Sequence, residues 1–328
     1  QRKPITNDII TDLFSEPKFD KKDDKIESDL VISYIHKGSQ LLSTSRTKAS
    51  RLYTSESGHC SRKSALSSVL EADGISSPSF PFYTSIGKQV EITILEALAR
   101  TNVLVFPNLY KYNSVLDEAT SQFDIPDIGM NLGGKLDAVI YLDKPYILEI
   151  KTAGQNLPTN PDTEKPQHVA QARLYSAILG VDSILLYFSR NVSSDMHGRK
   201  LKAKEFLYKF DRGQSYKYIF EVALSRYYLD NGFIPPIPSH IKFENKEKAC
   251  SYCDLVGYCW DLKYKVEREF KFSKQLVEPT KHEIEVANHN AHLFCAEFLK
   301  PESIKERRKE FYQRLKDIGN PYYKDVIK

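Results

Sequence analysis

The chain has 328 residues, of which 41% are hydrophobic and 27% charged, and its formal net charge is +4 at neutral pH. This apolar content suffices for a folded core, so the composition excludes a wholly disordered protein. No apolar run approaches the roughly 18 residues of a membrane helix, and the small positive charge is compatible with nucleic acid without being specific for it. Five cysteines are too few for a secreted disulfide framework, so we expect a reducing, cytoplasmic location and no membrane partner.

Three regions follow one another along the chain. Residues 1–29 carry a mixed-charge run and predict a charged N-terminal arm, whereas residues 30–262 have the texture of one globular domain. In that domain we expect strands at 103–106, 136–142, 146–151, 183–188 and 205–210, and helices over 85–100, 165–179 and 214–229. Residues 263–328 predict a helical C-terminal extension, with helices near 282–299 and 302–318. The loose alternation of strands and helices predicts an α/β or α+β fold with a central mixed β-sheet flanked by helices.

Two carboxylates are predicted to face each other across a β-hairpin. A turn at Asp143-Lys144 joins two strands, and pairing about that turn sets Asp137 opposite Glu149, with Lys151 on the same face. Opposed side chains lie about 5 Å apart in such a pair, where two negative charges are destabilising. A cation such as Mg²⁺ between the carboxylates would remove that repulsion. The simpler alternative is a solvent-facing strand end with a Glu149–Lys151 ion pair.

Two predicted helices add polar side chains. Glu91 shares a helix face with apolar residues at offsets of three, four and seven, where a carboxylate needs a partner, a metal or a route to solvent. In the next helix His168, Gln171 and Tyr175 lie on one stripe. Taken alone, a polar stripe of this kind is typical of the wet side of an amphipathic helix.

The order of these residues resembles the signature of the PD-(D/E)XK nuclease superfamily, in its RecB-like branch. That signature is carried by Asp137, then Glu149-Ile150-Lys151, then Gln171-x-x-x-Tyr175. Upstream, Gly87-x-x-x-Glu91 falls where the branch has a Gly-x-x-x-His or Glu motif that supplies a further metal ligand. Leu136 replaces the proline of the superfamily's name, and Glu91 stands where histidine is commoner. The second departure leaves the metal preference open, because a carboxylate is a harder ligand than imidazole.

The resemblance implies a restriction-endonuclease-like nuclease core and a metal-dependent DNA exonuclease. Its substrate would be single-stranded DNA or duplex ends, in DNA processing, recombination, repair or CRISPR-type adaptation. Mg²⁺ or Mn²⁺ would be held by Glu91, Asp137, Glu149 and the carbonyl of Ile150, and Lys151 would stabilise the developing charge. The resemblance also implies that Gln171 and Tyr175 position the substrate strand.

The cysteines form a second group. Cys250, Cys253 and Cys259 lie within ten residues, and Cys60, about 190 residues upstream, is the expected fourth member. Four cysteines fit either tetrahedral zinc or a [4Fe–4S] cluster, and spacing does not choose between them. The layout is similar to that of the iron–sulfur nucleases of the RecB-like branch, including the CRISPR-associated Cas-four family, which implies a structural [4Fe–4S] cluster. Cys295 is expected to be a buried thiol outside this group.

A basic segment at residues 199–217, with interleaved tyrosines at 208, 216 and 218, is a candidate DNA-binding track, although most such runs are solvated surfaces. The chain lacks a Gly-x-x-x-x-Gly-Lys-Ser/Thr loop, so a helicase motor, recombinase or integrase-type protein would be a separate partner. Two alternatives stay open. One is a catalytically silent iron–sulfur DNA-binding or adaptor subunit of a larger complex, and the other is a restriction-type endonuclease.

Overall fold

The computed structural model describes residues 51–56, 60–70, 79–107, 123–125, 128–153, 157–160, 165–189, 193–195, 198–200, 203–239, 250, 253, 255–260 and 272–319. The chain divides into two compact units, one made of Gln1–Thr44 and Ser76–Phe82 and the other of Ser45–Ile75 and Tyr83–Lys328. The second unit contains the central sheet. The arm predicted at residues 1–29 lies outside the described residues, and the domain boundaries near residues 30 and 262 stay predictions.

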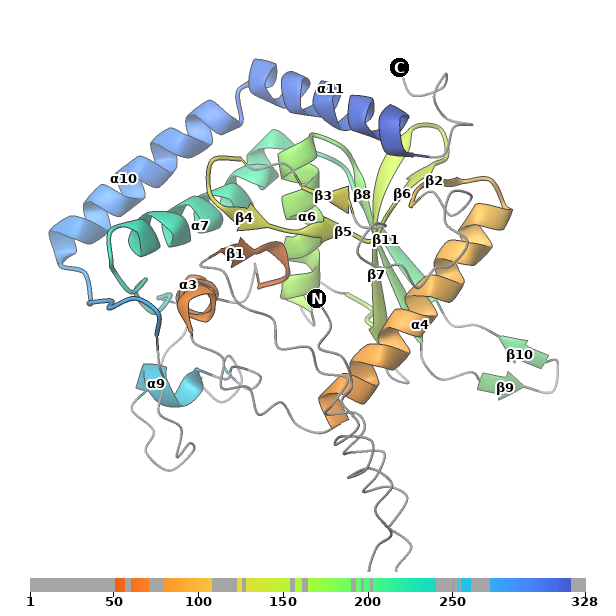
Figure 1. Ribbon diagram of the computed structural model, residues 1–328, viewed down its shortest axis with the longest axis horizontal. Coiled ribbons are helices and arrows are strands. Elements are labelled where there is room, and N and C mark those ends of the chain that lie inside the picture. The colour runs from red at the N-terminus through yellow and green to blue at the C-terminus, as the bar shows by residue number, and fades with distance from the viewer. Residues whose placement is uncertain are drawn as a thin grey trace, which may run out of the picture. The chain divides into compact units, whose positions relative to one another are not determined.

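A five-stranded mixed sheet forms the centre of the second unit (Figure 1). Its strand order is β11-β8-β7-β6-β2, and its strands are β2 (Leu104–Phe106), β6 (Ala138–Tyr141), β7 (Pro145–Ala153), β8 (Ser183–Ser189) and β11 (Ala203–Tyr208). β7 and β8 are parallel, and the other neighbouring pairs are antiparallel. A parallel pair needs a crossover, which helix α6 (Pro166–Leu179) provides. The predicted mixed sheet flanked by helices is confirmed.

Alternate residues of β7 separate the two layers that cover the sheet. Ile147 belongs to the same buried cluster as Ile178 of α6, whereas Leu148 and Ile150 pack with Leu95 of helix α4 (Ser79–Arg100). Figure 1 shows α4 and α6 on opposite sides of the sheet. Burial of both faces explains why β7 begins with four consecutive apolar residues, 145–148.

The helix ends follow from local chemistry. α6 begins with Pro166, whose missing N–H costs nothing at the first helical position, and it ends at Gly180 with φ of 65°. A Cβ at Gly180 would also lie 2.7 Å from Ile304 Cγ2, so both conformation and space favour glycine there. Helix α7 (Arg212–Asp230) is capped by the Asp211 carboxylate, which accepts a hydrogen bond from the Gln214 N–H.

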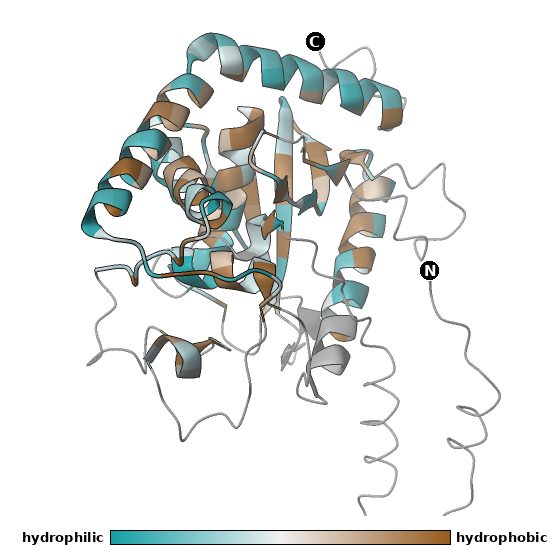
Figure 2. Ribbon diagram, turned by 60° about the vertical axis from the view of Figure 1, so that its left-hand side comes forward, coloured by the Kyte–Doolittle hydropathy of each residue, from teal (hydrophilic) through white to brown (hydrophobic). Residues whose placement is uncertain are grey.

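The two C-terminal helices, α10 (Lys281–Phe298) and α11 (Pro301–Ile318), match their predicted ranges within one residue. Their apolar and polar residues fall on different sides, as Figure 2 shows, and the apolar side joins the main core. Arg307 and Arg308 of α11 each donate a 2.7 Å hydrogen bond, to the carbonyls of Ile178 and Gly180. Positive charge is favourable at the C-terminal end of α6, so this contact joins the last helix to the crossover helix.

Short elements complete the unit, and the sequence did not predict them, except that the predicted strand at 136–142 included Leu136 and is divided between β5 and β6 (Ala138–Tyr141). They are β1 (Leu52–Tyr53), η1 (Thr54–Glu56), α3 (Ser61–Val69), β3 (Phe123–Asp124), β4 (Leu132–Gly133), β5 (Lys135–Leu136), β9 (Ser193–Asp195), β10 (Gly198–Lys200) and α9 (Val256–Trp260). β1 pairs in parallel with β4, and β3 pairs antiparallel with β5. Within the described part of the chain, none of the helices combines the length and apolar character needed to cross a membrane.

Candidate active site

The hairpin of β6 and β7 has the predicted register. Ala138 pairs with Leu148, and each further pair up to Tyr141 and Pro145 follows the same register. Continuing it by one residue sets Asp137 opposite Glu149. The Asp137 side chain bends back to β7, where its Oδ2 accepts a 2.7 Å hydrogen bond from the Ile150 N–H.

Glu149 is completely buried and only half satisfied. Its Oε1 accepts a hydrogen bond from the Lys151 ammonium, which lies two residues along β7 on the same face. Its Oε2 is also buried, and it has no hydrogen-bond partner. A buried carboxylate oxygen left without a donor is costly, and a strained structure, a catalytic role, or a bound water or ion can account for such a group.

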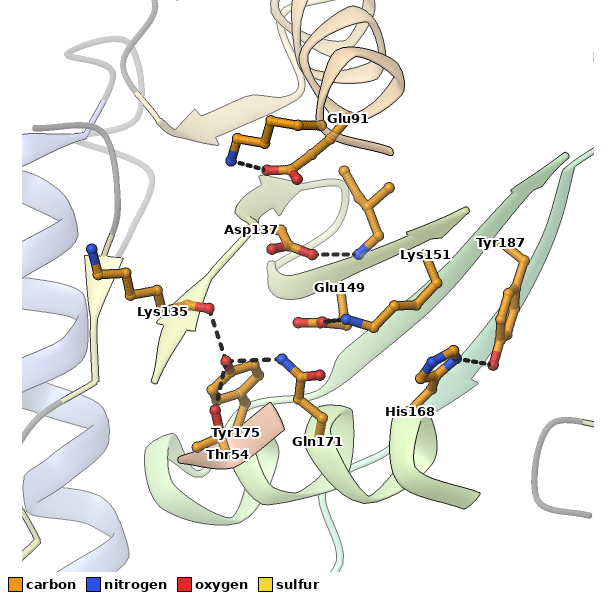
Figure 3. Close-up of polar contacts among 12 residues, drawn as sticks. Thr54, Glu91, Lys135, Asp137, Glu149, Lys151, His168, Gln171, Tyr175 and Tyr187 are labelled. Carbon is orange, nitrogen blue, oxygen red and sulfur yellow. Dashed lines mark hydrogen bonds and ion pairs between the residues drawn. The ribbon is translucent and has the colours of Figure 1, made fainter. Parts of the chain in front are cut away.

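Glu91 extends from α4 toward the same place. Figure 3 shows Glu91, Asp137 and Glu149 one after another, contributed by α4, the start of β6 and β7. Lys88, one turn earlier on α4, lies 3.1 Å from Glu91 Oε1. The predicted apolar stripe beside Glu91 is confirmed, because Ile94 and Leu95 are buried against the sheet.

The electrostatics of the three carboxylates are coupled. Burial, followed by the charge of Asp137, raises the pKa of Glu149 to about 8 and that of Glu91 to about 7. Burial likewise raises the pKa of Asp137, against the opposing effect of Lys151. Burial lowers the pKa of Lys151, but the carboxylates around it outweigh that effect and raise it overall. Three carboxylates thus lie near two ammonium groups, those of Lys88 and Lys151, and the cluster would be stabilised by additional positive charge.

The polar stripe of α6 is divided between two networks (Figure 3). Gln171 Nε2 lies 3.2 Å from the Tyr175 hydroxyl, and both residues are buried. His168 instead pairs with Tyr187 of β8, with 2.9 Å between Nδ1 and the hydroxyl oxygen. Gln171 therefore belongs to the acidic side of the site, whereas His168 is joined to the neighbouring strand.

The four predicted cysteines belong to two segments that lie far apart in the sequence and interact electrostatically. Cys60 directly precedes α3, while Cys250, Cys253 and Cys259 lie on and before α9, and all four are half-buried. Burial raises the pKa of Cys60 and Cys259 and brings that of Cys253 to about 11, and each thiol is further affected by the charge of at least one of the others. Cys295 is fully buried in α10, away from this group, as predicted.

Two sets of side chains offer donor atoms of the kinds that metals bind, the carboxylates of the acidic site and the cysteine thiols. Among the residues that the structure describes, no group of three or more His, Cys, Asp or Glu side chains is arranged so that it could hold a metal ion. Each carboxylate of the acidic site instead accepts a hydrogen bond from a neighbour, namely Lys88, the Ile150 N–H or Lys151. The unpartnered Oε2 of Glu149 within an all-oxygen donor set fits a hard divalent cation. The cysteine thiols are the donor type that zinc and iron–sulfur clusters take.

Several residues that contact the predicted site residues do not belong to any of the predicted site motifs. Thr54 of η1 donates a 2.9 Å hydrogen bond to the Tyr175 hydroxyl across 121 residues of sequence. Arg62 of α3 is buried next to the cysteines, where it pairs with Glu278 at 2.6 Å and donates to the Pro235 carbonyl. No local pattern in the sequence indicated Thr54.

The basic segment at 199–217 is only partly available as a surface. Tyr208 is buried, and the guanidinium of Arg173 lies 4.5 Å from the centre of its ring. Tyr216 stacks on Phe220 and on His292 of α10. The inclusion of Tyr208 in the candidate DNA-binding track is therefore wrong, because this ring is part of the interior.

No family model and no curated protein matches the sequence. Among solved structures, the chain is similar to the crystal structure of SSO0001, with 16% identity, a TM-score of 0.35, and coverage of 70% of this chain and 96% of that one. It is also similar to an alkaline exonuclease (LHK-Exo) from Laribacter hongkongensis, with 16% identity, a TM-score of 0.33, and coverage of 56% and 90%. Likenesses of this size carry no argument about activity.

Proposed function

We propose that the protein is a metal-dependent deoxyribonuclease, and specifically an exonuclease that hydrolyses single-stranded DNA or duplex ends. The observation that carries the proposal is the fully buried Glu149, with one unpartnered oxygen, beside Asp137, Glu91 and Lys151. An all-oxygen acidic site next to a lysine suits phosphodiester hydrolysis, in which negative charge must be bound and then stabilised as it grows. The motif order of the sequence supports the same reaction.

The residues that would hold Mg²⁺ or Mn²⁺ are Glu91, Asp137, Glu149 and the carbonyl of Ile150. When bound, the cation supplies Lewis acidity and charge neutralisation at the phosphodiester. Asp137 is oriented by the Ile150 N–H, so its second oxygen can be directed at the same point as the free oxygen of Glu149. Burial disfavours the ionised form of each carboxylate when no counter-charge is nearby, so binding of a cation between the carboxylates is favoured.

Lys151 has two tasks in this proposal. Its ion pair with Glu149 holds the ammonium on the face of β7 that carries the carboxylates. The pKa of Lys151 is raised, so the group stays protonated at neutral pH and can stabilise charge that develops on the phosphate. A nearby ammonium that remains charged is the simplest way to favour the transition state over the substrate.

The cysteine group is proposed to be structural. A [4Fe–4S] cluster, or zinc as the alternative, would be held by Cys60, Cys250, Cys253 and Cys259, and it would join α3 to α9. This group is separate from the acidic site, so we assign it no step in hydrolysis. DNA is the proposed partner, and a helicase, recombinase or integrase-type protein would act as a separate chain.

The experiment uses 5′- and 3′-labelled single-stranded and duplex DNA with Mn²⁺, for the wild-type protein and Glu149→Gln. We expect stepwise shortening from an end by the wild type and no shortening by the variant. Binding without cleavage by the wild type would instead support a silent DNA-binding or adaptor subunit. Cleavage of closed circular DNA would support a restriction-type endonuclease.

A further inference from the structure

The hydroxyl of Tyr175 is held at the centre of a buried hydrogen-bond network. It donates to the Lys135 carbonyl at 2.8 Å, and it accepts from Thr54 Oγ1 at 2.9 Å and from Gln171 Nε2 at 3.2 Å. A phenol offers one donor and accepts about two hydrogen bonds, so this hydroxyl has used its full capacity. Tyr175 is fully buried as well. It therefore has neither the exposure nor a remaining hydrogen bond with which to contact a substrate.

The network ends two residues before Asp137. Lys135 and Leu136 form β5, and the chain turns from there into Asp137 and β6. The Lys135 carbonyl is fixed by Tyr175, and Leu136 is buried. The position of the Asp137 backbone is therefore set from one side by α6, while its carboxylate is set from the other by the Ile150 N–H.

Thr54 packs against the segment that leads into β5. A Cβ at Gly134 would lie 2.5 Å from Thr54 Oγ1 and 2.7 Å from Thr54 Cγ2, so both branches of the threonine occupy the space that a side chain at position 134 would need. The preceding residues bind the same strand, because Arg51 donates to the Leu132 carbonyl at 3.0 Å and β1 pairs with β4. Thr54 is fully enclosed by these contacts.

We infer that Thr54 is a positioning residue that, through the Tyr175 hydroxyl and the Lys135 carbonyl, fixes Asp137 for cation binding. Tyr175 acts in the same network and does not contact DNA. This inference rests on the proposed function of the acidic site. It assigns a role to η1, a segment that no motif indicated, and it joins the chain leading to Cys60 with the acidic site.

The inference predicts a specific kinetic pattern. Thr54→Val keeps the shape of the side chain but removes the hydroxyl donor, which leaves the Tyr175 oxygen short of one partner. Misplacing a reacting group by about an ångström reduces turnover on the order of 100-fold, so we expect kcat to fall 10- to 100-fold. The KM for DNA should stay unchanged, because no substrate contact is lost. Thr54→Ser keeps the donor and should retain kcat within about threefold of the wild type.

Tyr175→Phe completes a double-mutant cycle with Thr54→Val. Both changes break one network, so their effects on kcat and on the unfolding free energy without metal should be clearly less than additive. Thr101→Val is the matched control, because the Thr101 hydroxyl makes one exposed hydrogen bond to the Leu98 carbonyl. A large increase in KM with Tyr175→Phe and a wild-type kcat for Thr54→Val would overturn the inference in favour of a DNA-contacting tyrosine.

Titration with Mn²⁺ separates this inference from the proposed function. We expect Thr54→Val to weaken Mn²⁺ binding and Thr54→Ser to restore it. A wild-type protein that binds Mn²⁺ but does not cut DNA would contradict the nuclease proposal, while the Mn²⁺ affinities would still support or reject the role of Thr54. Equal Mn²⁺ affinity of Thr54→Val and wild type, or no Mn²⁺ binding by either, would overturn the inference.

Discussion

The backbone N–H of Ile150 donates a 2.7 Å hydrogen bond to the carboxylate of Asp137, which lies just beyond the last pair of the β6–β7 ladder. The strand that carries Glu149 therefore also orients the carboxylate opposite it. Asp137 is held on one side by this bond and on the other by the Tyr175–Lys135 contact. The backbone thus keeps Asp137 in place opposite a carboxylate whose charge repels it.

The first prediction concerns this pair. Asp137→Asn and Glu149→Gln keep the shape of each side chain while removing a charged ligand, so each should lower the cleavage rate by a factor on the order of 10³. The fold should persist, because each change also removes like-charge repulsion. Circular dichroism and DNA cleavage on the same preparations provide the check, and wild-type cleavage by either variant would exclude these carboxylates from the active site.

The pH dependence of stability follows from Glu149. Its pKa rises from 4.5 in the unfolded chain to about 8 in the folded protein, so the folded state holds the proton more tightly. From about pH 4.5 to about pH 8 the unfolded chain binds fewer protons, and stability without metal should fall as pH rises. Thermal unfolding in a pH series measures this. Glu149→Gln should flatten the slope, and an identical slope in that variant would contradict the assignment.

Replacing Glu91 tests its role as a ligand. Glu91→His keeps a metal-binding group and should retain partial activity, with a shift toward Mn²⁺ because imidazole is a softer ligand than carboxylate. Glu91→Ala removes the group and should reduce activity much further. Rates with Mg²⁺ and Mn²⁺ should be compared for both. Full activity of Glu91→Ala would leave only the ion pair with Lys88 as a role for this residue.

The cysteine group is tested by metal content. Cys60→Ala should lose bound iron and sulfide, or zinc, because it removes the one ligand contributed by the N-terminal side. Cys295→Ala is the control: this thiol is buried in α10 away from the group, so the variant should keep the metal despite some loss of core packing. Stoichiometric zinc without iron would reject the [4Fe–4S] assignment, and unchanged metal in Cys60→Ala would remove Cys60 from the site.

Arg62 should stabilise the region around these cysteines. Its guanidinium is buried, pairs with Glu278 and donates to the Pro235 carbonyl. Arg62→Met should therefore cost about 1–3 kcal/mol of unfolding free energy, since it leaves a buried carbonyl without its donor. Arg226→Met breaks the pair with Asp230 on α7, in which the arginine is more exposed than Arg62, and should cost no more than about 0.5 kcal/mol. Denaturant unfolding of both variants makes the comparison, and equal losses would contradict this role of Arg62.

The sequence predicted the strands and helices in which apolar and polar residues follow a regular local pattern. The β6–β7 register follows from a turn at Asp143-Lys144 and strict alternation, and the helices carry their own start and stop signals, such as Pro166 and Gly180. The two-residue strands β1 and β4 have no period to detect, because their pairing depends on tertiary contacts. Short elements of this kind were missed for that reason.

The motif residues of the candidate site could be predicted from the sequence, but the residues that hold them in position could not. Residue order indicated Asp137 and Glu149, and helical spacing indicated Glu91. The contacts of Thr54 with Tyr175 and of Arg62 with Glu278 join residues 121 and 216 positions apart, and neither has a spacing rule. The burial of Tyr208 was not predicted, because a basic segment with interleaved tyrosines has the same sequence pattern whether it lies on an exposed surface or at the edge of a core.

The central claim is that the acidic cluster around Glu149 binds a divalent cation for DNA hydrolysis. The most direct test is Mn²⁺ titration and cleavage of end-labelled DNA on the same preparations of wild type, Glu149→Gln and the control Thr101→Val. We predict that wild type and control bind Mn²⁺ and shorten the DNA from an end, whereas Glu149→Gln binds Mn²⁺ weakly and leaves the DNA intact. Equal Mn²⁺ binding and equal cleavage by all three proteins would contradict the claim.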